Sequence, residues 1–161
     1  MKQLAVKPEI HKFETAKEFA EAFKLGKDDL VITNEYIYKP FFGALNLPCA
    51  TLFQEKYGVG EPSDDMVEAM YKDVHGSYKR IIAIGGGTVI DISKFFSLKH
   101  TSPVLDLYDG KQEIVKGKEL IIVPTTCGTG SEVTPFAIVT DDKTGIKYPI
   151  ADYELTPDMA I

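Results

Sequence analysis

The chain has 161 residues, of which 44% are hydrophobic and 26% are charged, a composition typical of a soluble globular domain with one core. Its formal net charge of −6, with lysines and arginines scattered along the chain, disfavours binding to nucleic acid or to an anionic membrane surface. Residues 1–13 lack the apolar stretch of a signal peptide, and no apolar run approaches the roughly 20 residues that cross a bilayer. We therefore expect a cytoplasmic protein that binds neither nucleic acid nor membrane.

The first third of the chain predicts a helix followed by two strands. Thr15, with Glu18 three residues later, forms a capping box, and Gly26 provides a stop, so we expect a short amphipathic helix between them. Residues 30–33 and 50–53 are short apolar runs rich in β-branched side chains, which indicates two strands.

Two further helices are indicated on either side of the second strand. The first would begin at Lys39 with Pro40 in its first turn and would run toward Leu47. Ser63, followed by two aspartates at the positive end of a helix dipole, predicts the N-cap of the second, which would end near Gly76.

The centre of the chain predicts a strand, a glycine turn and a helix in direct succession. Residues 80–84 are apolar on both faces, as in a central parallel strand that helices cover on both sides. Three glycines follow, after which Val89, Ile92 and Phe96 recur on one helical stripe that ends near Lys99.

The last third predicts another buried strand and a hairpin. Residues 120–123 form a doubly buried strand that Pro124 ends, and residues 136–140 pair with residues 146–150 across a turn. The alternation of strands and helices predicts an α/β fold with a Rossmann-like, mostly parallel sheet, flanking helices and a β-hairpin near the C-terminus. Ligands of such sheets lie beyond the carboxyl ends of the strands.

The glycine turn is the first candidate site. Residues 85–87 remove three side chains where a strand passes into a helix, so backbone amides can approach a pyrophosphate at the positive helix end. Because Ile90 stands where the GxGxxG pattern has its third glycine, a tight turn without a ligand is the alternative. Thr88 and Asp91 also have an alternative role, since Thr-x-x-Asp resembles a capping box.

The loop at residues 124–133 is the second candidate site, because hydroxyl groups, glycines and a carboxylate directly follow a buried strand. Such a loop offers hydrogen-bond donors and close backbone approach to a polar ligand. The alternative is an ordinary connection into a helix, with Ser131 or Thr129 as the cap and Glu132 in the first turn.

The spacing of the cysteines and histidines predicts neither a disulfide nor a metal site. Cys49 and Cys127 lie far apart without CxxC spacing, so we expect reduced thiols and, for Cys127, a small buried side chain rather than a nucleophile. His11, His75 and His100 fall in different segments without i,i+4 partners, so spacing assembles no metal site from them.

The segments GGGTVIDISK at residues 85–94 and PTTCGTGSEVT at residues 124–134 resemble, in order and spacing, the paired signatures of the iron-containing alcohol dehydrogenase family. The similarity extends over essentially the whole chain. It implies that residues 1–161 form the N-terminal Rossmann-like domain, which holds NAD, with NADP not excluded. The family's C-terminal helical domain, which holds divalent iron or zinc through an Asp and three His, would be absent from this chain.

The resemblance also implies the reaction, which is hydride transfer between NAD(H) and a small primary alcohol or aldehyde. The segments TNEYIYKPF, FQEKYGVGEPSDDM and RIIAIGGGTVIDISK are most similar to the members of the family that act on 4-hydroxybutyrate. The implied substrates are therefore 4-hydroxybutyrate and succinate semialdehyde. A homodimer is compatible with the sequence, and no catalytic residue or metal ligand is assigned within this chain.

Cofactor-binding positions carry over residue by residue. The family's phosphate-contacting positions correspond to Gly85, Gly86, Gly87, Thr88 and Asp91, those that line the cleft to Thr125, Thr126 and Thr129, and the hairpin lysine to Lys147. Asn34, with Glu35 beside it, stands where the family often has an Asp that receives ribose hydroxyls and repels a 2′-phosphate. Ser63 replaces the family's usual Asn and is expected at least to cap its helix.

Two other classes of protein remain as alternatives. The chain could be a non-catalytic nucleotide-binding fragment or a module that needs a partner chain. It could also be a metal-dependent lyase or sugar-phosphate dehydrogenase related to dehydroquinate synthase or glycerol dehydrogenase, although the second motif of those enzymes departs from GTGSEVT. We expect the chain by itself to bind cofactor without turnover.

Overall fold

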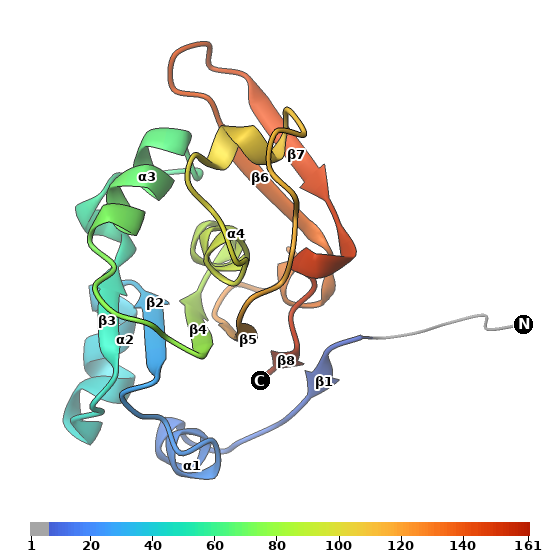
Figure 1. Ribbon diagram of the computed structural model, residues 1–161. Helices are drawn as coiled ribbons and strands as arrows, with labels where there is room; N and C mark the ends of the chain where they lie inside the picture. The colour runs from blue at the N-terminus through green and yellow to red at the C-terminus, as the bar shows by residue number, and fades with distance from the viewer. Residues whose placement is uncertain (1–6) are drawn as a thin grey trace, which may run out of the picture.

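A sheet of six strands, in which all pairings are parallel, forms the centre of the computed structural model (Figure 1). The structure describes residues 7–161, so residues 1–6 of the segment predicted to lack a signal peptide lie outside the described residues. The strand order is β1-β8-β5-β4-β2-β3. The strands are β1 (Glu9–Ile10), β2 (Asp29–Thr33), β3 (Ala50–Phe53), β4 (Arg80–Gly85), β5 (Glu119–Pro124) and β8 (Met159–Ala160).

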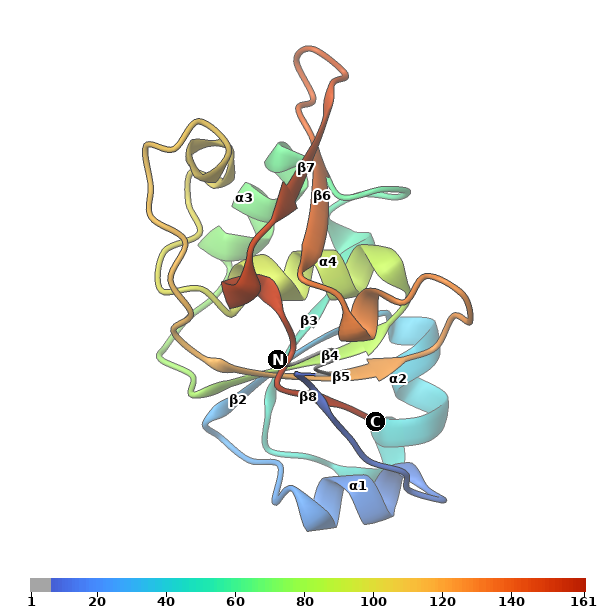
Figure 2. The ribbon, with the colours of Figure 1, turned by 90° about the vertical axis from the view of Figure 1, so that its right-hand side faces the viewer.

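Within the described residues 7–161, four α-helices and a hairpin cover the two faces of this sheet. The helices are α1 (Ala16–Ala22), α2 (Glu35–Phe42), α3 (Asp64–Lys72) and α4 (Gly87–Phe96), and the antiparallel hairpin consists of β6 (Phe136–Thr140) and β7 (Lys147–Ala151). Helices α1 and α2 lie on one face, whereas α3 and α4 lie on the other, with α4 between the sheet and the hairpin (Figure 2). Within the described part of the chain, no helix is both long enough and apolar enough to cross a membrane.

Alternating side chains of the central strands fill two cores. Ile81 and Ala83 of β4 pack with α3 and α4, while Ile82 and Ile84 of the same strand pack with α1 and α2. All four are at most 1% exposed, because successive side chains of a strand point to opposite faces and helices cover both. The predicted α/β fold with a mostly parallel sheet, flanking helices and a hairpin is confirmed.

Several predicted boundaries were wrong. Helix α2 begins at Glu35 with Asn34 in the N-cap position, and Pro40 lies inside the helix rather than at its start. A proline inside a helix removes one backbone hydrogen bond, which this helix tolerates two residues before its end. Helix α3 is capped by Ser63 as predicted but ends at Lys72, four residues before Gly76.

The edge strand β1 and its neighbour β8 were not predicted. Each has two residues, too few for a hydrophobic period to be visible in the sequence. They form because backbone groups of the neighbouring strand would otherwise lack hydrogen-bond partners. Strand β8 pairs with β5, and β1 pairs with β8.

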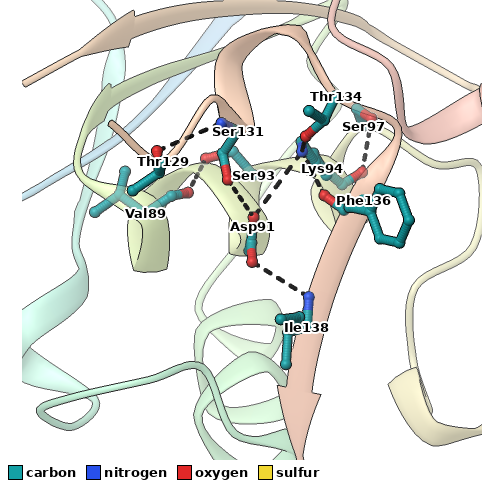
Figure 3. A network of polar contacts seen from close by, with 10 residues as sticks. All are labelled: Val89, Asp91, Ser93, Lys94, Ser97, Thr129, Ser131, Thr134, Phe136 and Ile138. Atoms are coloured by element: carbon teal, nitrogen blue, oxygen red, sulfur yellow. Dashed lines mark hydrogen bonds and ion pairs between the residues drawn. The ribbon is translucent and has the colours of Figure 1, made fainter. Parts of the chain in front are cut away.

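Lys94 joins α4 to the hairpin (Figure 3). Its side chain is fully buried, and its Nζ donates hydrogen bonds to the Phe136 carbonyl and, at 3.5 Å, to Thr134 Oγ1. The Asp91 carboxylate lies 4.0 Å from this Nζ. Burial lowers the pKa of Lys94 from 10.5 to about 8, and the carboxylates of Asp91 and Glu132 oppose this shift only in part.

Asp91 makes a second connection from the same helix. Its carboxylate accepts hydrogen bonds from the Ile138 backbone amide at 3.2 Å and from Ser131 Oγ at 3.4 Å (Figure 3). Burial raises the pKa of Asp91, while Lys94 lowers it. Helix α4 therefore positions both the hairpin and the loop that contains the second sequence motif.

We expect the wild-type protein to gain stability relative to a Lys94→Met variant as the pH rises above 8. The pKa of Lys94 in the folded state, about 8, is below its unfolded value of 10.5, so the cost of burying the charge is fully present below pH 8. This cost disappears as the lysine loses its proton. The free energy of unfolding of the wild type minus that of the variant should therefore rise by up to about 3 kcal/mol between about pH 8 and pH 10.5. Urea denaturation of both proteins across this range measures the difference.

The exposed Lys99 provides a matched control. A Lys99→Met variant removes an exposed lysine in place of a buried one, so it shows how far the loss of a lysine charge by itself changes the free energy of unfolding over the same pH range. A free-energy difference between the wild type and Lys94→Met that stays constant with pH would show that Lys94 does not titrate with a lowered pKa.

Candidate functional site

A cavity of about 390 Å³ opens at the carboxyl ends of β2, β3 and β4, next to the N-terminus of α4. Six residues predicted from the sequence to contact a cofactor line it: Asn34, Gly86, Gly87, Thr88, Thr125 and Thr126. Tyr36, Gln54, Glu55, Gly58, Val59, Gly60 and Val89 complete its lining. The fold thus brings the glycine turn, the threonine-rich loop and the end of β2 together at one edge of the sheet.

Close packing explains the first two glycines of the turn. A Cβ at Gly85 would lie 2.8 Å from Val89 Cβ, and a Cβ at Gly86 would lie 2.9 Å from Thr126 Oγ1. Gly85 is buried and does not line the cavity, so it lets the first turn of α4 approach the end of β4. Gly86 is the N-cap residue of α4, and no side chain caps the helix there. The positive end of α4 is therefore left for an anion.

Thr88 connects α4 to the turn at Gly60, and both residues line the cavity. Its hydroxyl donates a hydrogen bond to the Gly60 carbonyl at 2.9 Å, and its oxygen can still accept one from a ligand. Gly60, at φ +90°, belongs to the turn between β3 and α3. The alternative in which Thr88 and Asp91 form a capping box is not what the structure shows, because Gly86 occupies the N-cap position.

A carboxylate that the sequence reasoning missed lies in this cavity. Asn34 Nδ2 donates hydrogen bonds to Gln54 Oε1 and to Glu55 Oε2, each at 3.1 Å, and the Glu35 amide donates to Glu55 Oε1 at 2.6 Å. Gln54 and Glu55 begin a short 3₁₀ helix directly after β3. The position of an acid just past a predicted strand was the one signal in the sequence that could have indicated Glu55.

Three other predicted residues lie around the cavity rather than in it. The Asp91 carboxylate is turned toward Ser131 and the hairpin. Thr129 is exposed, and its Cγ2 lies 3.8 Å from where a Cβ on Gly87 would be. Lys147 Nζ lies 2.6 Å from a carboxylate oxygen of Glu61 and lines a neighbouring cavity of about 530 Å³. The two cavities share Gly58 and Val59.

A third cavity, of about 440 Å³, lies on the face covered by α1 and α2. Most of its lining is aromatic or aliphatic, with Phe13, Phe19, Phe42, Ile84 and Val123 among its residues. It has no uncapped helix N-terminus comparable to that of α4, so it fits nucleotide phosphates less well.

The described residues do not fit a divalent iron or zinc site. Within residues 7–161, one group of three potential ligands has its atoms within 4.8 Å of one another, namely Asp64, Asp65 and Asp142, and it contains neither histidine nor cysteine. Its members are half-buried or exposed.

The two cysteines are free. Cys127 is exposed, which corrects the prediction of a small buried thiol, because the loop on both sides of it is exposed as well. Cys49 is half-buried, and burial raises the pKa of its thiol to about 11. A thiol with a raised pKa is a poor nucleophile, so the geometry gives Cys49 no catalytic role.

Known proteins share both the sequence and the fold. The family model described as iron-containing alcohol dehydrogenase matches residues 10–161. The chain is 52% identical over 162 aligned residues to 4-hydroxybutyrate dehydrogenase of Clostridium kluyveri, an alignment that covers all of this chain and 44% of that protein. The predicted similarity to members that act on 4-hydroxybutyrate is thus confirmed, and the chain spans less than half the length of this relative.

Solved structures give the same result. The sulfoacetaldehyde reductase of Bifidobacterium kashiwanohense in complex with NAD⁺ superposes with a TM-score of 0.78 at 25% identity, over all of this chain and 46% of that one. The NADH-dependent butanol dehydrogenase A of Thermotoga maritima shares the fold, with a TM-score of 0.73 at 20% identity over 98% of this chain and 43% of that one. Sequence and fold together show that the chain belongs to the iron-containing alcohol dehydrogenase family.

Proposed function

We propose that the chain is the nucleotide-binding part of a metal-dependent dehydrogenase that transfers hydride between NAD(H) and a small primary alcohol or aldehyde. The observation that carries this proposal is the uncapped N-terminus of α4 at a cavity of about 390 Å³. The 4-hydroxybutyrate dehydrogenase of Clostridium kluyveri, 52% identical to this chain, supports 4-hydroxybutyrate and succinate semialdehyde as the substrate pair.

The residues around the cavity fit a dinucleotide. A pyrophosphate beside Gly86 and Gly87 would meet the positive end of α4, an interaction worth about 0.3–1 kcal/mol at an exposed helix end and up to about 2 kcal/mol where it is partly buried. The hydroxyl groups of Thr125 and Thr126 line the same space and can donate to phosphate or ribose oxygens. The Thr88 hydroxyl donates to the Gly60 carbonyl, so its oxygen can accept a hydrogen bond from a ribose hydroxyl. Bound NAD(H) would supply the hydride donor or acceptor.

The metal ion of the proposed reaction needs ligands from outside the described residues. The resemblance to the family assigns an Asp and three His to its helical domain, and the aspartates at residues 64, 65 and 142 do not replace such a set. We therefore assign this chain the binding and orientation of the cofactor, and we derive no step that uses a metal.

A non-catalytic nucleotide-binding module is the second candidate function. The lack of a fitting metal site within residues 7–161 is compatible with this candidate as well as with the first. Both candidates use the same cavity, and they differ in whether a metal-binding helical domain acts with this chain.

We expect a Gly87→Asp variant to bind NADH at least about 30-fold more weakly than the wild type, because a carboxylate at the first position of α4 would repel the pyrophosphate. The same carboxylate should leave the fold intact or stabilise it, since an acidic side chain in the first turn favours a helix by about 0.3–1 kcal/mol. The Cβ has room there, with Thr129 Cγ2 as the nearest atom at 3.8 Å. Titration of NADH fluorescence, with thermal unfolding followed in parallel, measures both effects.

Gly87→Asn is the matched control, because it has nearly the same shape as Gly87→Asp without the charge. It should weaken NADH binding by less than about 5-fold. Equal affinities of the two variants for NADH would place the phosphates away from α4.

We also expect the 161-residue chain to bind NADH but to give no turnover of 4-hydroxybutyrate with NAD⁺, whether or not Fe²⁺ or Zn²⁺ is added. A version fused to the helical domain of the Clostridium kluyveri relative should oxidise 4-hydroxybutyrate in the presence of the metal. Absorbance at the NADH wavelength measures both. Turnover by the 161-residue chain alone would contradict our placement of the metal ligands, and an inactive but metal-loaded fusion that binds NADH would favour the non-catalytic module.

A further inference from the structure

We propose that Glu55 makes the site selective for NAD over NADP by accepting hydrogen bonds from the hydroxyls of the adenosine ribose. This inference rests on the proposed function, because it requires a dinucleotide in the cavity beside α4. It assigns the role to the end of β3, a strand that the sequence motifs of the family do not include.

The register of the sheet brings Glu55 to the correct edge. Thr33, the last residue of β2, pairs with Ile84 of β4 on one side and with Phe53 of β3 on the other. The carboxyl ends of the three parallel strands are therefore level. A dinucleotide whose phosphates lie at the turn after β4 extends its adenosine ribose toward the neighbouring strand ends, where dinucleotide-binding folds place an acidic residue.

The residue at the end of β2 is uncharged. Asn34 stands there, and its Nδ2 is engaged by Gln54 and Glu55. The neighbouring Glu35 does not supply the charge either, because it does not line the cavity and its carboxylate pairs with Lys39 Nζ at 3.0 Å. Glu55 is the carboxylate in the lining of the cavity.

The contacts of Glu55 fix its carboxylate without neutralising it. One oxygen accepts from Asn34 Nδ2 at 3.1 Å and the other from the Glu35 amide at 2.6 Å, and both donors are uncharged. Within residues 7–161 no ion pair involves Glu55. Each carboxylate oxygen keeps a lone pair that can accept from a ribose hydroxyl. A 2′-phosphate at the same place would meet a fixed negative charge.

Titration of the 161-residue chain with NADH and NADPH tests the proposal. We expect the wild type to bind NADH at least about 100-fold more tightly than NADPH. A Glu55→Gln variant keeps the size of the side chain and its acceptor oxygen but loses the charge. It should bind NADH about 10-fold more weakly and NADPH more tightly, so that the preference falls below about 5-fold. The matched control Glu35→Gln should keep the wild-type preference.

Two further measurements separate charge from shape. A Glu55→Asp variant withdraws the carboxylate but keeps its charge, so it should weaken NADH binding while NADPH stays excluded. The probes 5′-AMP and adenosine 2′,5′-bisphosphate repeat the comparison without the nicotinamide half. The preference for 5′-AMP should likewise fall in Glu55→Gln.

The outcomes distinguish this inference from the proposed function. NADH binding that Gly87→Asp weakens, combined with an unchanged NADH-to-NADPH preference in Glu55→Gln, would overturn the role of Glu55 alone. The same holds if Glu35→Gln reduces the preference as much as Glu55→Gln does. Failure of the wild type to bind either dinucleotide would overturn both proposals.

Discussion

The close approach of α4 to the end of β4 is the constraint on which the rest of the site depends. A side chain at Gly85 would collide with Val89 Cβ at 2.8 Å, so any larger residue there would force the helix away from the strand. A side chain at Gly86 would meet Thr126 Oγ1 at 2.9 Å, and the exposed threonine would have to rotate away. Overpacking of this kind typically costs about 1–3 kcal/mol. At Gly85 it would also move the positive end of α4 away from the edge where β2, β3 and the threonine-rich loop converge.

The same helix also explains why the two sequence motifs act as one unit. Asp91 and Lys94 belong to the first motif, yet neither lines the cavity. Their side chains contact the second motif and the hairpin instead (Figure 3). The Asp91 carboxylate lies 4.0 Å from Lys94 Nζ and offsets only part of the cost of burying the lysine charge, since the pKa of Lys94 still falls to about 8. A buried pair of this kind contributes little net stability, so its main effect is to fix where the second motif lies relative to α4.

Local patterns in the sequence predicted the local features of the fold. The caps at Thr15 and Ser63 and the doubly apolar strands could be found because the residues that determine them are neighbours in the chain. The two-residue strands β1 and β8 could not be found, because they owe their conformation to partners more than 100 residues away in the case of β1. The direction of the Asp91 side chain was missed for the same reason, since its partners lie up to 47 positions further along the chain.

Glu55 shows what kind of information about a site only the fold can supply. It lies 21 positions from Asn34 in the sequence, and only the parallel, in-register pairing of β2 with β3 brings the two side chains into contact. Because the two strands end level, an acidic residue after either one reaches the same edge of the cavity. An Asn at the end of β2 therefore does not remove negative charge from this edge. The carboxylate comes instead from the next strand, and the amide of Asn34 holds it in place.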